Sequence, residues 1–410
     1  MTSRLKNKHM VLGVCGGIAA YKSVEVLRLL TKRDASVRVI MTANATEFVG
    51  RMTFEALSGK PVSTSLFEKG ADASIKHIDW AEDADAVLIA PATANIIGKL
   101  ANGIADDALT TFMMAVTAPV FICPSMNTNM YRSRAVQRNL TTLADDGYAI
   151  MEPGSGELAC GTTGPGRLPE PEDIVDRLES YLTPKDLKNK RVLVTAGPTR
   201  ESVDPVRYIS NPSTGKMGYA VARAAENRGA AVTLISGPSL QPKPSNVTLV
   251  KVNTAEEMAA AVLKLSDDSD IIIKTAAVSD FRPRAQANHK LKKEQAEMCI
   301  ELEKTRDILK ELGKRKKTGQ ILVGFAAETE ALEKNAAKKL AQKNLDIIAG
   351  NMIGESGAGF GSDTNRVTLF SRGGTREVIP EMDKDALAHV LMDRIMQFVP
   401  TDKSDGSNRQ

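Results

Sequence analysis

Residues 8–42 read "KHMVLGVCGGIAAYKSVEVLRLLTKRDASVRVIMT" and follow the order of a parallel α/β unit. An apolar run at 10–14 meets a glycine turn, and a stretch with Val24, Leu27 and Leu30 at helical spacing comes next. A second strand is expected over 37–41. A strand, a helix and a second strand over about 30 residues form the βαβ unit of a parallel sheet. This stretch therefore predicts a sheet covered by helices.

The second half of the chain repeats that order in "KRVLVTAGPTR" (190–200), "GKMGYAVARAAENRGA" (215–230) and "AVTLISG" (231–237). A chain of 410 residues suits two domains of about 200 residues each. We therefore predict two doubly wound, Rossmann-like α/β domains. The boundary is expected near residue 190, because Pro184 ends a helix and a charged run follows it. The domains are then 1–190 and 191–410.

Further elements continue the alternation of strands and helices. In the first half, strands are expected at 86–90, 119–123 and 148–151. The second half should have strands at 247–252, 270–276, 298–303, 321–325 and 346–349, then shorter β-rich stretches near 366–371 and 376–379, and a last helix at 383–397. Ligands of such sheets bind at the carboxyl ends of the strands, so we expect sites beside the first glycine loop of each half.

Composition excludes several classes of protein. The net charge of +4 is small for this length, so nucleic acid is not an expected partner. No apolar run approaches the ~18 residues of a membrane span, and the charged N-terminus resembles neither a signal nor a transit peptide. The cysteines at 15, 123, 160 and 299 are far apart, which favours reduced thiols over a disulfide or zinc framework. A cytoplasmic protein is expected.

The glycine loop "GVCGGIAAYK" follows a strand and opens a helix, so its amides are suited to an anion. Its spacing is not the GxGxxG of dinucleotide-binding proteins, and the second strand ends in Thr42 rather than in an acidic residue. Thr93, in "IAPATANIIGK", adds a hydroxyl at another strand end. The pattern favours a mononucleotide phosphate; a tight turn without a ligand is the alternative.

Three other features of the first half bear chemistry. Asn127 and Met130 lie in "CPSMNTNMYRS", directly after a predicted strand, and could also form a turn and a helix cap. His77 precedes a buried strand, where a lone histidine is more often structural than catalytic. Cys160 lies in the glycine-rich "GSGELACGTTGPGR" and is a surface thiol, a metal ligand or a reagent.

These motifs occur in the order "GGIAAYK", "KHID", "APATAN", "PSMNTNMY" and "ACGTTGPGR". In this order, residues 8–182 resemble the homo-oligomeric flavin-containing cysteine decarboxylases, specifically phosphopantothenoylcysteine decarboxylase. The resemblance implies a flavodoxin-like fold and FMN held by Gly16, Gly17, Thr42 and Thr93. It also implies His77 as an acid/base, Asn127 as the ligand of the substrate carboxylate with Met130 beside it, and Cys160 on a movable flap.

The chemistry implied by this resemblance explains why a thiol is needed. Flavin oxidises the cysteine thiol of the substrate to a thioaldehyde, which accepts the electrons left when carbon dioxide departs. The resulting enethiol must then be protonated and reduced. Cys160, on a flexible glycine-rich flap, is the implied proton donor of this last step.

The second half carries the polar loop "VTAGPTRESVDPVRYISNPSTGKMG" at 194–218. Met217 follows the lysine, so the GxxxxGK[ST] pattern of a P-loop is absent. The hydroxyls of Ser210, Ser213 and Thr214 and the cation Arg207 nevertheless suit a phosphorylated ligand. Downstream, "HKLKKE" and "AAKKLAQKNLD" are rich in lysine, which could equally be a solvated surface.

The order of "DPVRYISNPSTGKMG", "AAVSDF", "KLKK", "GFAAET" and "KNLD" resembles phosphopantothenate–cysteine ligase over residues 191–397. The resemblance implies that CTP activates the phosphopantothenate carboxylate as an acyl-cytidylate, which the amine of cysteine then attacks. It makes Lys290 the catalytic lysine, assigns Asn211 to the acyl intermediate and Arg207 to the substrate, and suggests Mg²⁺ as the companion of CTP. The implied CTP contacts are Ala276, Asp280, Lys290, Arg306, Asp307, Ile308, Leu309, Phe325, Lys339 and Lys343.

One departure from the ligase pattern is "TRDIL" at 305–309, where relatives read "NPDIV". The sequence shows no cluster of metal ligands, and Asp280 is the one candidate for contact with a cation.

Taken together, the two resemblances predict a bifunctional enzyme that joins 4'-phosphopantothenate to L-cysteine and then decarboxylates the product to 4'-phosphopantetheine. They also predict homo-oligomers, with decarboxylase trimers and ligase dimers. Two other interpretations remain open. A tandem oxidoreductase would bind NAD(P), although neither half has the fingerprint. A regulatory subunit with a flavin fold would lack chemistry, although it would then have no need of His77, Asn127 and Cys160 together.

Overall fold

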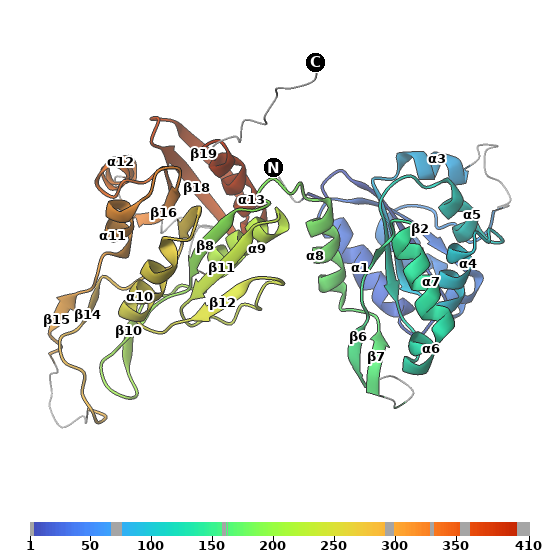
Figure 1. The fold of residues 1–410 in the computed structure, drawn as a ribbon, viewed down its shortest axis with the longest axis horizontal. Helices are drawn as coiled ribbons and strands as arrows, with labels where there is room; N and C mark the ends of the chain where they lie inside the picture. The colour runs from blue at the N-terminus through green and yellow to red at the C-terminus, as the bar shows by residue number, and fades with distance from the viewer. Residues whose placement is uncertain are drawn as a thin grey trace, which may run out of the picture. The chain divides into compact units, whose positions relative to one another are not determined.

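The computed structural model describes residues 4–66, 76–157, 161, 163–291, 299–328, 332–352 and 361–399. The chain forms two compact units that divide between Leu182 and Thr183. Each unit has its own central sheet with helices on both faces (Figure 1). The prediction of two α/β domains is confirmed.

In the part of the first domain that is described, a five-stranded parallel sheet has the order β2-β1-β3-β4-β5. This is the flavodoxin-like order, in which the direction of winding reverses between β1 and β3. The central strand β3 is buried along its whole length, as expected for a strand covered on both faces. The strands are β1 (His9–Val14), β2 (Ser36–Met41), β3 (Ala86–Ala92), β4 (Val120–Pro124) and β5 (Ala149–Ile150).

Helices cover both faces of this sheet. One core contains side chains of α1 (Ala20–Lys32), α2 (Arg51–Ser58) and α8 (Pro171–Leu182). The opposite core contains side chains of α3 (Lys76–Asp83), α4 (Ala94–Ala101), α5 (Ala108–Ala115) and α7 (Arg134–Asp145). The short helices η1 (Ala43–Glu47) and α6 (Thr128–Arg132) follow strand ends, and β6 (Gly154–Glu157) pairs with β7 (Thr163–Arg167) in a hairpin.

The second domain is built on an eight-stranded sheet of order β12-β11-β8-β13-β16-β17-β18-β19, again among the described residues. Its first six members are parallel and follow the Rossmann order, which reverses between β8 and β13. They are β8 (Arg191–Ala196), β11 (Ala231–Ser236), β12 (Thr248–Lys251), β13 (Ile271–Lys274), β16 (Ile321–Glu328) and β17 (Ile347–Met352). β18 (Thr364–Ser371) and β19 (Arg376–Asp383) extend the sheet in antiparallel fashion, longer than the sequence predicted.

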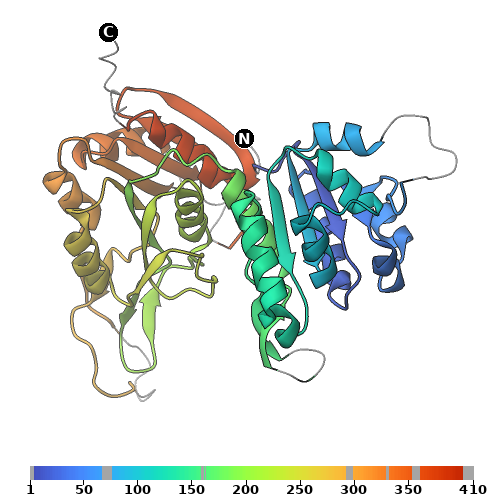
Figure 2. The same ribbon diagram turned by 45° about the vertical axis from the view of Figure 1, so that its right-hand side comes forward.

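The second sheet is also covered on both faces (Figure 2). α9 (Lys216–Asn227) and α13 (Lys384–Met396) share one core. On the other face lie α10 (Ala255–Ser266), α11 (Ile308–Arg315) and α12 (Leu332–Gln342). The alternation of side chains along a strand therefore decides which layer each strand-end residue faces.

One predicted strand of the main sheet is wrong. Residues 298–303 were expected to form such a strand, but the described part of this segment contributes only to β15 (Leu302–Lys304). β15 pairs with β14 (Phe281–Pro283) in a separate antiparallel ribbon, and β9 (Arg200–Ser202) pairs likewise with β10 (Tyr208–Ser210). Leu302 and Phe281 are both 46% exposed, so this ribbon has too little apolar cover to be a core strand.

The connector between the domains packs on the second domain, so the compact units divide after Leu182, a few residues before the expected boundary near 190. Leu187 is fully buried in the core of the second domain. Arg228, 3% exposed, donates to carboxylate oxygens of Asp186 and Asp393 at 2.7 Å. These contacts bind the connector to α9 and α13 of the second domain.

None of the helices in the described residues has the length and apolar character to cross a membrane.

Candidate active sites

The first cavity lies at the carboxyl edge of the first sheet, where the winding direction reverses. Its volume is about 810 Å³. Loops after β1, β2, β3 and β4 supply its wall, as the geometry of a parallel sheet requires. The structure brings together here the sequence-predicted residues Gly16, Gly17, Thr42, Thr93, Asn127 and Met130.

The helix that follows the glycine loop begins without a capping side chain. Ala19 occupies the N-cap position of α1, and the first turn has no acidic residue. α4, in contrast, is capped by Thr93, whose hydroxyl accepts a hydrogen bond from the amide of Ile96 at 3.4 Å. The positive end of the α1 dipole therefore meets the cavity with no negative partner of its own, which suits a bound phosphate.

Gly16 lies where two loops touch. A Cβ atom at this position would be 2.4 Å from Cβ of Asn44 and 2.6 Å from its carbonyl carbon. Asn44, in η1 after β2, was not singled out from the sequence although it lines the same cavity as Thr42. Only glycine allows the loop after β1 to approach the loop after β2 this closely.

Cys15, beside this loop, is a packing residue. It is 1% exposed, and burial raises the pKa of its thiol to about 12. The thiol is therefore neutral at physiological pH and too poorly ionised to act as a nucleophile. Cys15 fills space between β1 and the start of α4.

The hairpin β6–β7 is attached to the loop that carries Asn127. The amide of Met126 donates to the carbonyl oxygen of Gly166 at 3.0 Å. Gly166 has φ of 140°, and a Cβ atom there would be 2.2 Å from the carbonyl oxygen of Met126. Asn127 begins α6, and its side chain accepts a hydrogen bond from the amide of Asn129 at 2.8 Å.

Both strands of the hairpin reach the first cavity, because Glu157 and Arg167 line it. Cys160 follows Glu157 by three positions in the sequence but lies outside the described residues. The structure thus places the base of the expected flap at the cavity.

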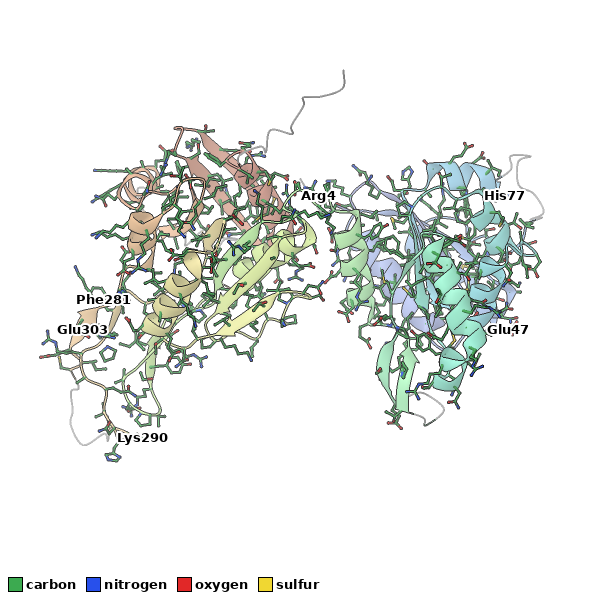
Figure 3. All side chains as sticks on the ribbon, in the orientation of Figure 1. Arg4, Glu47, His77, Phe281, Lys290 and Glu303 are labelled. Atoms are coloured by element: carbon green, nitrogen blue, oxygen red, sulfur yellow. The ribbon has the colours of Figure 1, made fainter. Side chains whose placement is uncertain are left out.

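His77 is not brought to this cavity. It lies in the first turn of α3, partly buried, and is absent from the lining residues of the first domain (Figure 3). α3 packs against α5 on the face of the sheet that α4, α5 and α7 also cover. The role of His77 stays a prediction.

Sequence reasoning missed an ion-pair group at the cavity wall. Lys99 donates to Asp106 at 2.6 Å and to Asp107 at 3.0 Å, and these contacts raise its pKa. Asn95 and Lys99 both line the cavity from one face of α4, at positions i and i+4. That spacing, directly after Thr93, was a signal that the sequence contained.

The second cavity, of about 390 Å³, lies at the carboxyl edge of the second sheet. It is formed where the winding reverses between β8 and β13, as in the first domain. The predicted residues Asn211, Ala276, Asp280, Phe325 and Lys339 converge on it. Asn211 is fixed by a hydrogen bond from its amide Nδ2 to the carbonyl oxygen of Ala277 at 3.0 Å.

α9 begins at this cavity and, like α1, has no capping side chain and no acidic residue in its first turn. Ser213, Gly215 and Lys216 line the cavity at the helix start. The ammonium group of Lys216 donates to Asp363 at 2.5 Å, and this contact lowers the pKa of the Asp363 carboxyl. Backbone amides and a lysine at one helix end suit a phosphate group.

Several predicted ligase residues lie outside this cavity. Lys290 is exposed at the outer end of the extension that carries β14 and β15 (Figure 3). The guanidinium of Arg207 donates to the carbonyl oxygen of Leu291 at 3.2 Å, which holds this segment to the 204–207 loop.

Lys343 pairs with Asp307 at 2.9 Å, and Arg306 donates to Glu311 at 2.6 Å. Ile308 and Leu309, in the first turn of α11, pack against the core on that face of the sheet.

Lys274 lies on β13 immediately before the cavity residue Thr275, but on the face that α10, α11 and α12 cover. Its ammonium nitrogen is buried and has no hydrogen-bond partner among the described residues. Burial lowers its pKa to about 7. The charge of Asp307 acts against this shift, and the charge of Lys343 adds to it. In the sequence, Lys274 is simply the last residue of the apolar run "IIIK", and nothing in that run marks it as a buried charge.

Three further lining residues were missed by sequence reasoning: Asn351 on β17, Asn365 on β18 and Lys384 at the start of α13. Asn365 is 5% and Lys384 7% exposed. They come from the end of the chain and reach the cavity only through the order of strands in the sheet.

Comparisons with known proteins match the two halves of the chain to two different families. Residues 1–183 match the Flavoprotein family, and residues 187–399 match the DNA/pantothenate metabolism flavoprotein C-terminal domain. The coenzyme A biosynthesis bifunctional protein CoaBC of Bacillus subtilis is 51% identical over 395 residues, which cover 95% of this chain and 97% of that protein. The chain belongs to the CoaBC family.

A second full-length relative and a solved domain are similar to this chain as well. The CoaBC protein of Escherichia coli is 46% identical over 396 residues, covering 96% of this chain and 97% of that protein. A solved C-terminal domain of a CoaBC protein is 43% identical, with a TM-score of 0.44, covering 52% of this chain and 96% of that chain. As a CoaBC protein, this chain is a bifunctional enzyme of coenzyme A biosynthesis, with a flavoprotein decarboxylase domain followed by a ligase domain.

Proposed function

We propose that the second domain uses CTP to couple cysteine to 4'-phosphopantothenate, and that the first domain uses FMN to convert the product to 4'-phosphopantetheine. The observation that carries the proposal is the same in both domains. Each sheet has a cavity at its winding reversal, and at each cavity a helix begins with no capping side chain while motif residues from separate strands converge.

The first cavity fits FMN in size and in the chemistry of its wall. The uncapped start of α1, Thr42 and Thr93 would hold the phosphate, with Gly16 permitting the close approach of two loops. Bound flavin would supply the oxidation that makes loss of carbon dioxide possible. Asn127 would bind the substrate carboxylate, Met130 would contact the substrate, and Cys160 would donate a proton to the enethiol.

The second cavity fits a nucleotide and an acyl phosphate. The start of α9 with Lys216 would bind phosphate, while Ala276, Asp280, Phe325 and Lys339 would hold the rest of CTP. Asn211, already oriented by Ala277, would position the acyl group. Mg²⁺ is proposed as the partner of the triphosphate, with Asp280 as the candidate contact.

Three of the predicted residues outside the ligase cavity would reach it by movement. Lys290 lies on the extension that carries β14 and β15, Arg207 lies on the 204–207 loop that contacts this extension, and Lys343 would exchange Asp307 for a phosphate oxygen. The homo-oligomer proposed from the sequence, trimeric in the first domain and dimeric in the second, would also supply surfaces from other copies. Ile18 and Tyr21, at the rim of the first cavity, are 66% and 61% exposed, which supports association through that rim. The cytoplasm remains the proposed compartment.

The full reaction tests the proposed function. Purified protein mixed with phosphopantothenate, cysteine, CTP and Mg²⁺ is expected to yield phosphopantetheine, carbon dioxide, CMP and pyrophosphate in equal amounts. Omission of CTP should abolish all four products, and omission of Mg²⁺ should abolish nearly all. The products can be measured by mass spectrometry and pyrophosphate release. Full replacement of CTP by ATP would contradict the nucleotide assignment.

Gly16→Ala is expected to lower the flavin content of the purified protein by about tenfold or more, because the added methyl group forces two loops of the flavin cavity apart. The ratio of visible flavin absorbance to protein after desalting measures the effect. Gly50→Ala is the control, since its Cβ atom would have no neighbour within 4 Å and Gly50 does not line the cavity. Equal flavin content in Gly16→Ala and the wild type would show that this close approach does not shape the site.

A further inference from the structure

One substrate of the proposed ligase reaction has no assigned site. The residues expected from the sequence bind the nucleotide and the acyl group, whereas cysteine must also enter the cavity and present its amine. Cysteine carries hydrogen-bond donors on its amine and a negative charge on its carboxylate. A site for it therefore needs an acceptor and a cation at neighbouring positions.

The ligase cavity has such an acceptor in Asn351. This residue lines the cavity, and its Oδ1 atom is buried without a hydrogen-bond donor among the described residues. An unsatisfied buried acceptor destabilises the folded protein, because the group has lost its hydrogen bonds to water. That cost is offset when a ligand supplies the missing donor, so an orphan acceptor at a cavity wall marks a position where a donor group of the ligand is expected.

The strand pattern places Asn351 on the side of the sheet where phosphate would bind. Ile347 and Ala349 belong to the core under α9 and α13, so Asn351, two residues further, faces the same layer. The start of α9, with Lys216, lies in that layer. Asn351 is thus beside the phosphate end of the cavity, where the acyl phosphate bond would be broken.

A cation of the same cavity wall is Lys384. It lines the same cavity, is 7% exposed and begins α13, which packs against α9. Its ammonium group donates to the carbonyl oxygen of Ser362. Burial and the neighbouring Lys216 lower the pKa of Lys384, so an anion bound here would relieve the repulsion between two lysines.

We propose that Asn351 and Lys384 form the cysteine site of the ligase domain. Oδ1 of Asn351 accepts a hydrogen bond from the cysteine amine, and Lys384 binds the cysteine carboxylate. The nitrogen, after losing its ammonium proton, forms a bond to the acyl carbon. The bond from that carbon to the phosphate oxygen of CMP breaks, CMP takes the electron pair, and a second proton leaves the nitrogen.

The proposal rests on the proposed function, and the two can be tested separately. The activation step is followed without cysteine, as phosphopantothenate-dependent exchange of labelled pyrophosphate into CTP. The second step is followed with cysteine and with cysteamine, which has the amine but no carboxylate. If the wild-type protein shows no exchange with CTP, the proposed function fails and the cysteine site falls with it.

Asn351→Ala is expected to keep pyrophosphate exchange within about threefold of wild type while raising KM about tenfold or more for both cysteine and cysteamine. Lys384→Gln should raise KM by a similar factor for cysteine and leave that for cysteamine unchanged. Lys264→Gln, on the exposed surface of α10, is the control for loss of one positive charge.

Loss of exchange in Asn351→Ala would overturn the proposal, because Asn351 would then serve the nucleotide or the acyl group. Equal effects of Lys384→Gln on cysteine and cysteamine would overturn the carboxylate contact. Thermal unfolding of each variant checks that the domain is folded, and the two nucleophiles are compared within one variant, so a general loss of stability cannot produce the expected difference between them.

Discussion

Cys160→Ser is expected to release carbon dioxide from phosphopantothenoylcysteine but to form phosphopantetheine about 10²–10⁴ times more slowly than the wild type. A serine hydroxyl fits the space of the thiol but is a far weaker acid, so proton donation to the enethiol is the step that should fail. Carbon dioxide and phosphopantetheine are measured in the same sample. The ratio of the two, rather than either rate, carries the result.

Cys299→Ser is the matched control, because Cys299 is an exposed free thiol in the ligase domain. It should leave both products unchanged. Phosphopantetheine formed by Cys160→Ser at the rate of carbon dioxide release would make Cys160 a bystander. Loss of carbon dioxide as well would instead assign Cys160 to substrate binding or to the first step.

Lys274→Met is expected to stabilise the ligase domain at pH 7 by about 1–4 kcal/mol. The wild-type domain buries an ammonium group that lacks a hydrogen-bond partner in the described structure, whereas methionine has a similar shape and no charge. The pKa of Lys274 is about 7 in the folded protein and 10.5 as a free side chain. Between these values the unfolded chain binds more protons, so the stability of the wild type rises with pH.

The gain from Lys274→Met should therefore be largest near and below pH 7 and should decline toward pH 10. Thermal or denaturant unfolding of both proteins over this range measures the difference. Lys316→Met is the control: the Lys316 side chain is only 7% exposed but donates to Asp346 at 2.5 Å. Its loss removes one partner of the buried Asp346 carboxylate, which keeps the Leu322 amide and Arg372, and should destabilise by about 1–3 kcal/mol. A destabilised Lys274→Met at pH 7 would mean that the ammonium has a partner in the protein.

Parallel-sheet geometry explains which site residues could be predicted. Thr42 and Thr93 directly follow strands, Asn127 comes shortly after β4, and the carboxyl ends of parallel strands share one edge. Ala276 follows the same rule in the second domain, shortly after β13. For such residues, finding the strands in the sequence was sufficient to bring them together.

Other positions depend on tertiary contacts that no local pattern records. Lys343 meets Asp307 because the segment after α12 passes close to Gly313 of α11. His77 lies on α3, whose position depends on its packing against α5. Asn351 and Lys384 reach the ligase cavity because β17 lies two strands from β13 and α13 packs on α9. The order of strands, which the sequence does not state, decides these neighbours.

The connector that precedes β8 has a consequence for dissecting the enzyme. Asp186 is one of two carboxylates that neutralise the buried Arg228, and Leu187 fills a place in the core behind it. A ligase fragment begun at Arg191, the first residue of its sheet, would lose both and keep a buried cation with half of its counter-charge. A ligase fragment is therefore best begun at Thr183, because it then keeps both Asp186 and Leu187 with Arg228.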